Sequence, residues 1–114
     1  MAGKPSWFIV EEGAMPLLHT ALQEGFAGDA VVLRVNGREV FHREGVQTRR
    51  QIGLAATHEE QLPAGPITIE VSLPERQLTE ILPLSLSHDT YLGVSVNPQG
   101  KLTHVISREP FGYV

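Results

Sequence analysis

The segment PITIEVSLP, residues 66–74, constrains the fold more than any other feature, because its apolar and polar side chains alternate strictly. The apolar residues share one phase: Ile67, Ile69, Val71 and Leu73. Successive side chains of an extended chain point to opposite sides, so this phase defines one face of a strand. Prolines at both ends bound the segment. The pattern therefore predicts an antiparallel strand with one buried face and one solvated face.

A β-hairpin is predicted around residues 36–37, where the dipeptide Asn-Gly separates VVLRV from REVF. Asn-Gly readily adopts the two positive-φ positions of a type I′ turn, whose twist matches that of the flanking strands. A two-residue loop then places Arg34 opposite Glu39 and Leu33 opposite Val40. We expect Arg34 and Glu39 to form an exposed ion pair that stabilises the hairpin by roughly 0.2–1 kcal/mol.

A second hairpin is predicted around residues 97–100, NPQG, which favour a four-residue type I turn that ends in glycine. The flanking strands are residues 91–96 and 101–107. Leucines alternate with polar residues and proline over residues 82–86. Proline cannot donate a ladder hydrogen bond, so Pro83 indicates an edge or bulged strand.

Two further segments have weaker patterns. Residues 50–58 keep apolar side chains in one phase and become polar towards their end, so we expect a strand there. Residues 15–24 fit either a strand or one short N-terminal helix with Pro16 in its first turn and Gly25 as its cap. We favour the strand, because the neighbouring segments are all strands.

Together these segments predict an all-β fold of about eight strands. Strands spaced by about ten residues and joined by glycine and proline turns are typical of an antiparallel β-sandwich, Ig-like or jelly-roll-like, or of a small barrel. At 114 residues with 41% hydrophobic and 19% charged residues, the chain fits one domain, 1–114, with one core. Residues 1–14 are expected to form a flexible arm or an edge strand.

Charge and composition exclude several classes of protein. Thirteen acidic against nine basic residues give a net charge of −4, so we expect no nucleic-acid partner. The chain has no cysteine, which rules out a disulfide framework and a thiolate metal site. The apolar run at residues 7–10 is too short for a signal peptide, and no segment is long enough to span a bilayer. We therefore expect a soluble, cytoplasmic protein without membrane contact, provided that no leader was removed before Met1.

Histidines are the first candidates for chemistry, and they stand at positions 19, 42, 58, 88 and 104. Their spacing matches no known metal motif. His58 and Glu60 lie two apart, so on a strand both side chains point the same way and could begin a divalent-metal site. The alternative is a polar strand end. For His104, between two apolar neighbours, we expect partial burial with a hydrogen-bond partner.

Catalysis is not indicated by any other motif. No serine stands in the glycine-flanked turn that raises a hydrolase nucleophile. Residues 25–28, GFAG, lack the spacing and the following helix of a phosphate-binding loop. We therefore expect the protein not to be an enzyme.

Aromatic residues near the chain ends are the candidates for a ligand or partner surface. These are Trp7, Phe111 and Tyr113. One interpretation is that the closing segment PFGYV folds back over a sheet end or completes an edge. The other is that it forms an apolar patch that receives a protein partner or a glycan.

The stretches GFAGDAVVLRVNGREVFHREGVQT and GPITIEVSLP resemble the core of small bacterial β-sandwich modules, among them the calcium-dependent xylan-binding jelly-roll modules. The resemblance covers about half of the chain and implies a calcium ion held by carboxylates and carbonyls. This sequence has two aspartates, and only Asp29 lies in the similar stretch, so we expect no cofactor. The chain also resembles small uncharacterised bacterial β-sandwich proteins, which implies a fold and no activity.

Two functional hypotheses follow. The first is a non-enzymatic interaction or accessory module that associates with itself or with a protein partner through an edge strand. The second is a carbohydrate-binding or metal-dependent ligand-binding module that uses His58, Glu60 or the terminal aromatic residues.

Overall fold

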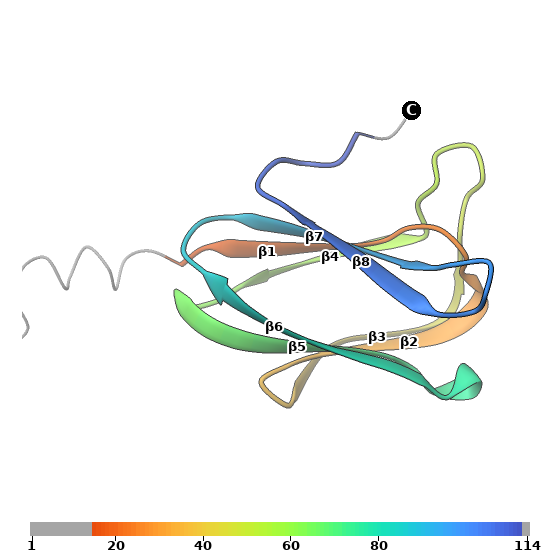
Figure 1. Cartoon of the computed structure of the whole chain (residues 1–114), viewed down its shortest axis with the longest axis horizontal. Helices are drawn as coiled ribbons and strands as arrows, with labels where there is room; N and C mark the ends of the chain where they lie inside the picture. Colours follow the sequence, from red (N-terminus) through yellow and green to blue (C-terminus); the bar gives the residue numbers. More distant parts are fainter. Residues whose placement is uncertain (1–14, 113–114) are drawn as a thin grey trace, which may run out of the picture.

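The computed structural model describes residues 15–112, which form eight strands and one short 3₁₀ turn. In chain order the elements are β1 (Leu17–Leu22), β2 (Ala27–Val35), β3 (Arg38–Gln47), β4 (Ala56–Gln61), β5 (Gly65–Leu73), η1 (Pro74–Arg76), β6 (Leu78–Leu86), β7 (Thr90–Val96) and β8 (Leu102–Ser107). They build two four-stranded sheets, ordered β4-β1-β7-β8 and β3-β2-β5-β6, that pack face to face (Figure 1). The predicted all-β sandwich of eight strands is confirmed. The predicted arm, residues 1–14, lies outside the described residues.

Strand β1 resolves the ambiguity of residues 15–24 in favour of a strand. It lies inside its sheet, antiparallel to β4 and parallel to β7. The β1–β7 pair is parallel, whereas the other strand pairs of residues 15–112 are antiparallel. A parallel pair needs a long connection, and here the connection runs through the whole opposite sheet.

The core lies between the two sheets and is built from the predicted alternating residues. The inward residues of β5 are all buried, which confirms the alternation in residues 66–74. In the facing sheet, Leu92 and Val94 of β7 are fully buried. Full burial of such a side chain stabilises the fold by about 1.5–3 kcal/mol, so this core outweighs any single surface contact.

The first hairpin has the predicted turn but not the full predicted register. Asn36 and Gly37 both have positive φ, and Arg34 faces Glu39 as expected. A register shift follows, so that Leu33 faces Phe41 and not Val40. Alternation alone could not reveal this shift. In a bulge, two residues of one strand lie opposite one residue of its partner, and the pattern within a single strand does not show where this happens.

The predicted ion pair between Arg34 and Glu39 is wrong, because Arg34 pairs with a different glutamate. Arg34 Nη1 lies 3.1 Å from Glu70 Oε2 of β5, on the other side of β2. Strand β2 is flanked by β3 and β5, so a residue on it has a cross-strand neighbour on each side. Glu70 faces Arg34 directly in the β2–β5 register.

The strand expected at residues 50–58 is also misplaced. Residues 50–53 form a turn closed by the Arg49 to Leu54 bridge, and β4 runs from Ala56 to Gln61. The Gly53 N–H donates to the Arg49 carbonyl at 2.8 Å, which fixes this turn. Strand β6, in contrast, lies at a sheet edge as Pro83 indicated.

The second hairpin is confirmed. The Gly100 N–H donates to the Asn97 carbonyl at 2.8 Å, which is the bond of a four-residue turn between β7 and β8. Within residues 15–112, no helix is long and apolar enough to cross a membrane.

Candidate functional site

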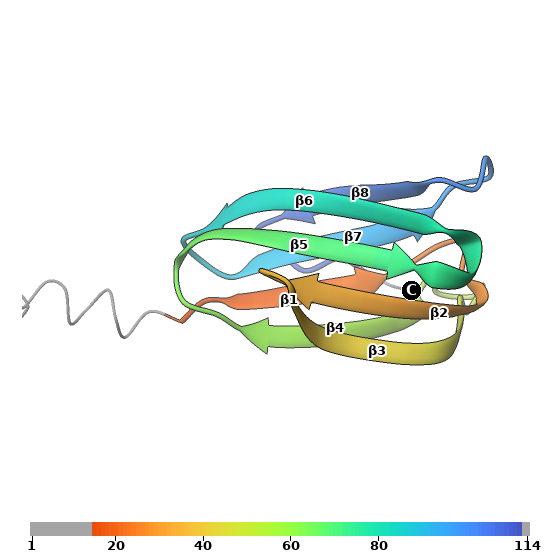
Figure 2. The same cartoon turned by 90° about the horizontal axis from the view of Figure 1, so that it is seen from below.

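Four strands lie at sheet edges, and they differ in how well they are protected from pairing with another chain. Strands β6 and β8 run along one side of the sandwich, and β3 and β4 run along the other (Figure 2). An edge strand presents unpaired backbone N–H and C=O groups, and proteins commonly block such edges with charges, proline or bulges. Strand β3 contains several charged residues and register shifts, β4 carries Glu59 and Glu60, and β6 carries Glu80 and Pro83.

Strand β8, with the sequence LTHVIS, has none of these protective features. It contains no proline, lysine, arginine, aspartate or glutamate, and its register against β7 is regular. Two of its large apolar side chains are exposed, Val105 at 57% and Ile106 at 47%. Strand β8 is therefore the open edge of the described fold.

His104 of β8 lies on the side of the strand that faces the opposite sheet. Its Nδ1 is 3.4 Å from Glu80 Oε1 of β6, so side chains of the two edge strands meet here. About a third of the His104 side chain is exposed, as the expected partial burial requires. The expected hydrogen-bond partner is missing among the described residues, because the contact with Glu80 Oε1 is not a hydrogen bond. Among the described residues, the outer backbone edge of β8 pairs with no other strand.

A second candidate site lies on the outer face of the β4-β1-β7-β8 sheet. Glu59, His19 and Tyr91 stand side by side on β4, β1 and β7. His19 Nδ1 donates to Glu59 Oε2 at 2.7 Å, and the His19 and Tyr91 rings stack with centroids 4.3 Å apart and planes within 10°. His19 Nε2 is shielded from water and has no hydrogen-bond partner among the described residues.

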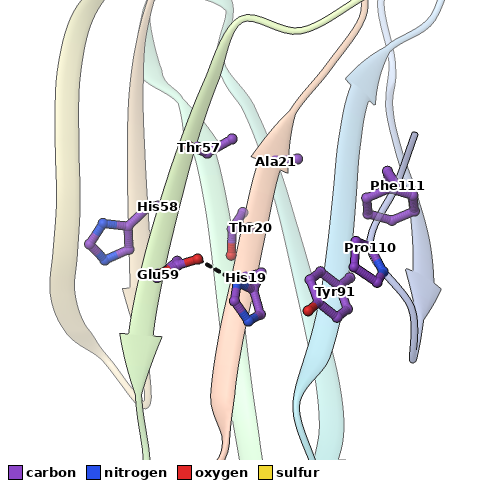
Figure 3. A pocket seen from close by; sticks show the side chains of 9 residues that line it. All are labelled: His19, Thr20, Ala21, Thr57, His58, Glu59, Tyr91, Pro110 and Phe111. Atoms are coloured by element: carbon purple, nitrogen blue, oxygen red, sulfur yellow. Dashed lines mark hydrogen bonds and ion pairs between the residues drawn. The ribbon is translucent and has the colours of Figure 1, made fainter. Parts of the chain in front are cut away.

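A hollow of about 170 Å³ lies beside this row. Its lining includes the side chains of Ala21 and Thr57, next to the His19–Tyr91 stack (Figure 3). Pro110 and Phe111, in the segment after β8, form part of its wall. The hollow is thus mostly apolar, with a histidine–glutamate pair at its border.

The predicted pair His58 and Glu60 does point the same way. His58 Nε2 donates to Glu60 Oε1 at 3.0 Å, and the His58 ring lies 5.4 Å from the Phe41 ring. Arg38 Nη2 is 3.7 Å from the other oxygen of Glu60. No group of three or more histidine and carboxylate side chains suited to a metal ion occurs within residues 15–112. The neighbouring guanidinium further disfavours a cation at this pair.

Of the three candidate aromatic residues, the structure places one. Phe111 is half-buried and, together with Pro110, lines the outer-face hollow. Trp7 and Tyr113 lie outside the described residues.

Asp29, the aspartate within the stretch that resembles the calcium-dependent modules, forms an ion pair with an arginine. Its Oδ1 and Oδ2 accept from Arg76 Nε at 2.7 Å and Nη2 at 2.8 Å, and Oδ2 also accepts from the Ala27 N–H. Burial alone raises the pKa of Asp29, but these hydrogen bonds and the arginine charge outweigh it and hold the pKa below its ordinary value. Asp29 contributes to the fold through Arg76.

The outer-face site was missed by sequence reasoning because its residues are distant in the chain. His19, Glu59 and Tyr91 come together only through the pairing of β1 with both β4 and β7. The one available signal was that all three stand at outward positions of their strands. That signal needs the sheet order, which the sequence pattern does not contain.

Comparison with known proteins adds no family to this description. No protein-family model matches the sequence, and a search of curated proteins finds no significant match.

Proposed function

We propose that this protein is a non-enzymatic interaction module that pairs with a second copy of itself through β8. The observation that carries the proposal is that β8 is the unprotected edge of the described fold, with Val105 and Ile106 exposed. Addition of a strand to an open edge is a common mode of protein recognition, in which backbone hydrogen bonds give affinity.

The hydrogen bonding of the β7–β8 hairpin indicates which backbone groups of β8 are free. Asn97 faces Lys101 next to the turn, and the Asn97 N–H donates to the Lys101 carbonyl at 2.8 Å. Bonded and non-bonded pairs alternate along an antiparallel ladder. Thr103, Val105 and Ser107 thus bond to β7, whereas the backbone groups of His104 and Ile106 point outward.

These outward groups fit a two-fold symmetric, antiparallel pairing centred on Val105. Val105 of one copy then faces Val105 of the other, and His104 faces Ile106 of the second copy. Each His104–Ile106 pair exchanges both backbone hydrogen bonds. A pairing centred on His104 would instead place two histidines opposite each other, which charge repulsion disfavours when they are protonated.

A second copy suits this edge in two further ways. Closed two-fold dimers are the commonest assemblies of soluble proteins, and both copies present the same surface. The chain carries a net charge of −4, so two copies repel each other overall, but β8 itself has no formally charged residue apart from His104 when protonated. The six-residue edge is small, so we expect a dissociation constant that is roughly micromolar.

Analytical ultracentrifugation at about 1–200 μM tests the proposal. The unsubstituted protein should dimerise, and Val105→Lys should be monomeric because two lysines would meet at the two-fold axis. His42→Lys is the matched control: the His42 side chain is 45% exposed on β3, which lies on the opposite side of the sandwich from β8 (Figure 2), so this variant should still dimerise. A monomeric unsubstituted protein at all concentrations, or a dimeric Val105→Lys variant, would contradict the proposal.

A further inference from the structure

Asn36 and Gly37, the tip of the hairpin between β2 and β3, combine a tight turn with a chemically reactive pair of residues. Both are exposed to solvent. Asparagine before glycine is prone to deamidation, because glycine has no side chain to hinder attack by its own backbone nitrogen. The other asparagine of the chain, Asn97, precedes Pro98, whose nitrogen carries no hydrogen and does not react in this way. Asn36 is thus the one asparagine of this sequence that can deamidate through the backbone.

The reaction has two steps and needs only water. The Gly37 backbone nitrogen loses its proton to water and bonds to Asn36 Cγ, while the side-chain amide nitrogen takes up a proton and leaves as ammonia. Water then opens the five-membered imide at either of two C–N bonds, which yields aspartate or isoaspartate. Isoaspartate adds a methylene group to the backbone, and a two-residue turn has no room for it without a change in hairpin register.

The folded protein holds the Asn36 side chain through a neighbouring strand. Asn36 Oδ1 accepts from the Thr68 N–H of β5 at 2.9 Å, and the Asn36 N–H donates to the Thr68 carbonyl at 2.8 Å. Asn36 therefore extends the β2–β5 ladder by one position beyond the pair of Val35 and Ile69, with its side-chain oxygen in place of a backbone carbonyl.

The turn conformation also opposes ring closure. The φ angles of Asn36 and Gly37, 51° and 82°, match a type I′ turn, in which ψ of the first residue is roughly +30°. At this ψ the Gly37 nitrogen and the Asn36 Cβ lie on opposite sides of the Cα–C bond, so the nitrogen points away from Cγ. Attack requires rotation about this bond and release of Oδ1 from Thr68. The hairpin tip must therefore open before Asn36 reacts.

We propose that Asn36 is a deamidation site gated by the fold. It persists while its amide is bonded to Thr68, and it converts to aspartate and isoaspartate when the hairpin tip opens. The aspartate product keeps an acceptor for the Thr68 N–H, so the tip closes again. The isoaspartate product prevents closure, which makes opening irreversible.

The test follows deamidation by mass spectrometry of peptides that contain Asn36 or Asn97. The unsubstituted protein is incubated at mildly alkaline pH, which promotes loss of the backbone proton, in native buffer and in guanidinium chloride. We expect Asn36 to react at least about fivefold more slowly in native buffer, as the hydrogen bond that must break provides. Asn97 should stay unmodified in both. Equal rates at Asn36 would overturn the gate, and an unmodified Asn36 in guanidinium chloride would overturn the site.

Two variants test the hydrogen bond to Asn36. Thr68→Pro removes the N–H that holds Oδ1, and Thr68→Ala is the matched control that keeps it. Circular dichroism establishes that both variants are folded. We expect Thr68→Pro to deamidate at Asn36 about fivefold faster than the unsubstituted protein in native buffer, and Thr68→Ala to match the unsubstituted protein. Equal rates in the two folded variants would overturn the role of Thr68. The comparison in guanidinium chloride decides the gate without any variant.

Discussion

Asp29 and Arg76, which lie 47 positions apart in the sequence, join the start of β2 to η1 through two parallel hydrogen bonds between the guanidinium and the carboxylate. Arg76 also donates to the Gly25 carbonyl at 3.2 Å, and the neighbouring Glu75 accepts from the Ala30 N–H. The turn after β5 is thereby fixed against the loop that connects the two sheets.

Replacement of Asp29 should destabilise the protein more than replacement of an exposed acidic residue. Asp29→Asn removes the charge that pairs with Arg76, and because the carboxylate is almost fully buried we expect a loss of about 2–3 kcal/mol in the free energy of unfolding. Glu70→Gln is the control, since the Arg34–Glu70 pair is about one third exposed and should contribute less than about 1 kcal/mol. Urea denaturation measures both. Equal losses would contradict the structural role of Asp29.

The same carboxylate should make stability depend on pH in the acid range. The pKa of Asp29 in the folded protein lies below its unfolded value of about 3.9, so its contribution to stability is complete above that value. This contribution is lost as the pH falls below about 4 through the lowered pKa of the folded state. We expect the stability difference between the unsubstituted protein and Asp29→Asn to shrink between about pH 6 and pH 2. A difference that stays constant over this range would show that ionisation of Asp29 is not involved.

Two glycines with similar backbone conformations should tolerate alanine very differently. Gly25 and Gly37 have φ of 87° and 82°. A Cβ atom at Gly25 would overlap the Val96 carbonyl oxygen, whereas one at Gly37 would meet nothing within 4 Å. We expect Gly37→Ala to cost about 1 kcal/mol from backbone strain alone, and Gly25→Ala about 3 kcal/mol or more. Thermal melting of both variants measures the difference, and similar losses would contradict the close contact at Gly25.

Proline substitutions in β8 test the alternation of its hydrogen bonds without reference to any partner. At Ile106 the N–H is expected to point outward, so Ile106→Pro should leave the β7–β8 ladder intact. At Val105 the N–H is expected to bond to β7, so Val105→Pro should cost about 1–3 kcal/mol more. Chemical denaturation of purified monomeric protein gives the comparison. Greater damage from Ile106→Pro would show that the inferred alternation is inverted.

The parts of this fold that depend on local pattern could be predicted, and those that depend on sheet order could not. The alternation of β5 and the turn at Asn97–Gly100 were predicted correctly, because side-chain periodicity and turn chemistry are encoded within a few residues. The bulge beside Phe41 and the start of β4 were missed, because each depends on the strand that lies alongside.

For the candidate sites too, features within one strand could be predicted and features that cross several strands could not. The pair of His58 and Glu60 was found because both residues belong to one strand. The row of Glu59, His19 and Tyr91 was missed because it crosses three strands, one of them paired in parallel. Association through an edge strand was predicted, but the strand could not be identified as β8 until the sheet order was known.

The position of β1 between β4 and β7 has a consequence for how the chain folds. The Leu17 N–H donates to Asp89 Oδ1 over a separation of 72 residues, next to the parallel pairing of β1 with β7. On the ribosome, β1 therefore remains without one of its two neighbours until the seventh strand has emerged. Such long-range closure is slow, so β1 stays exposed to mispairing while the strands between it and β7 are synthesised.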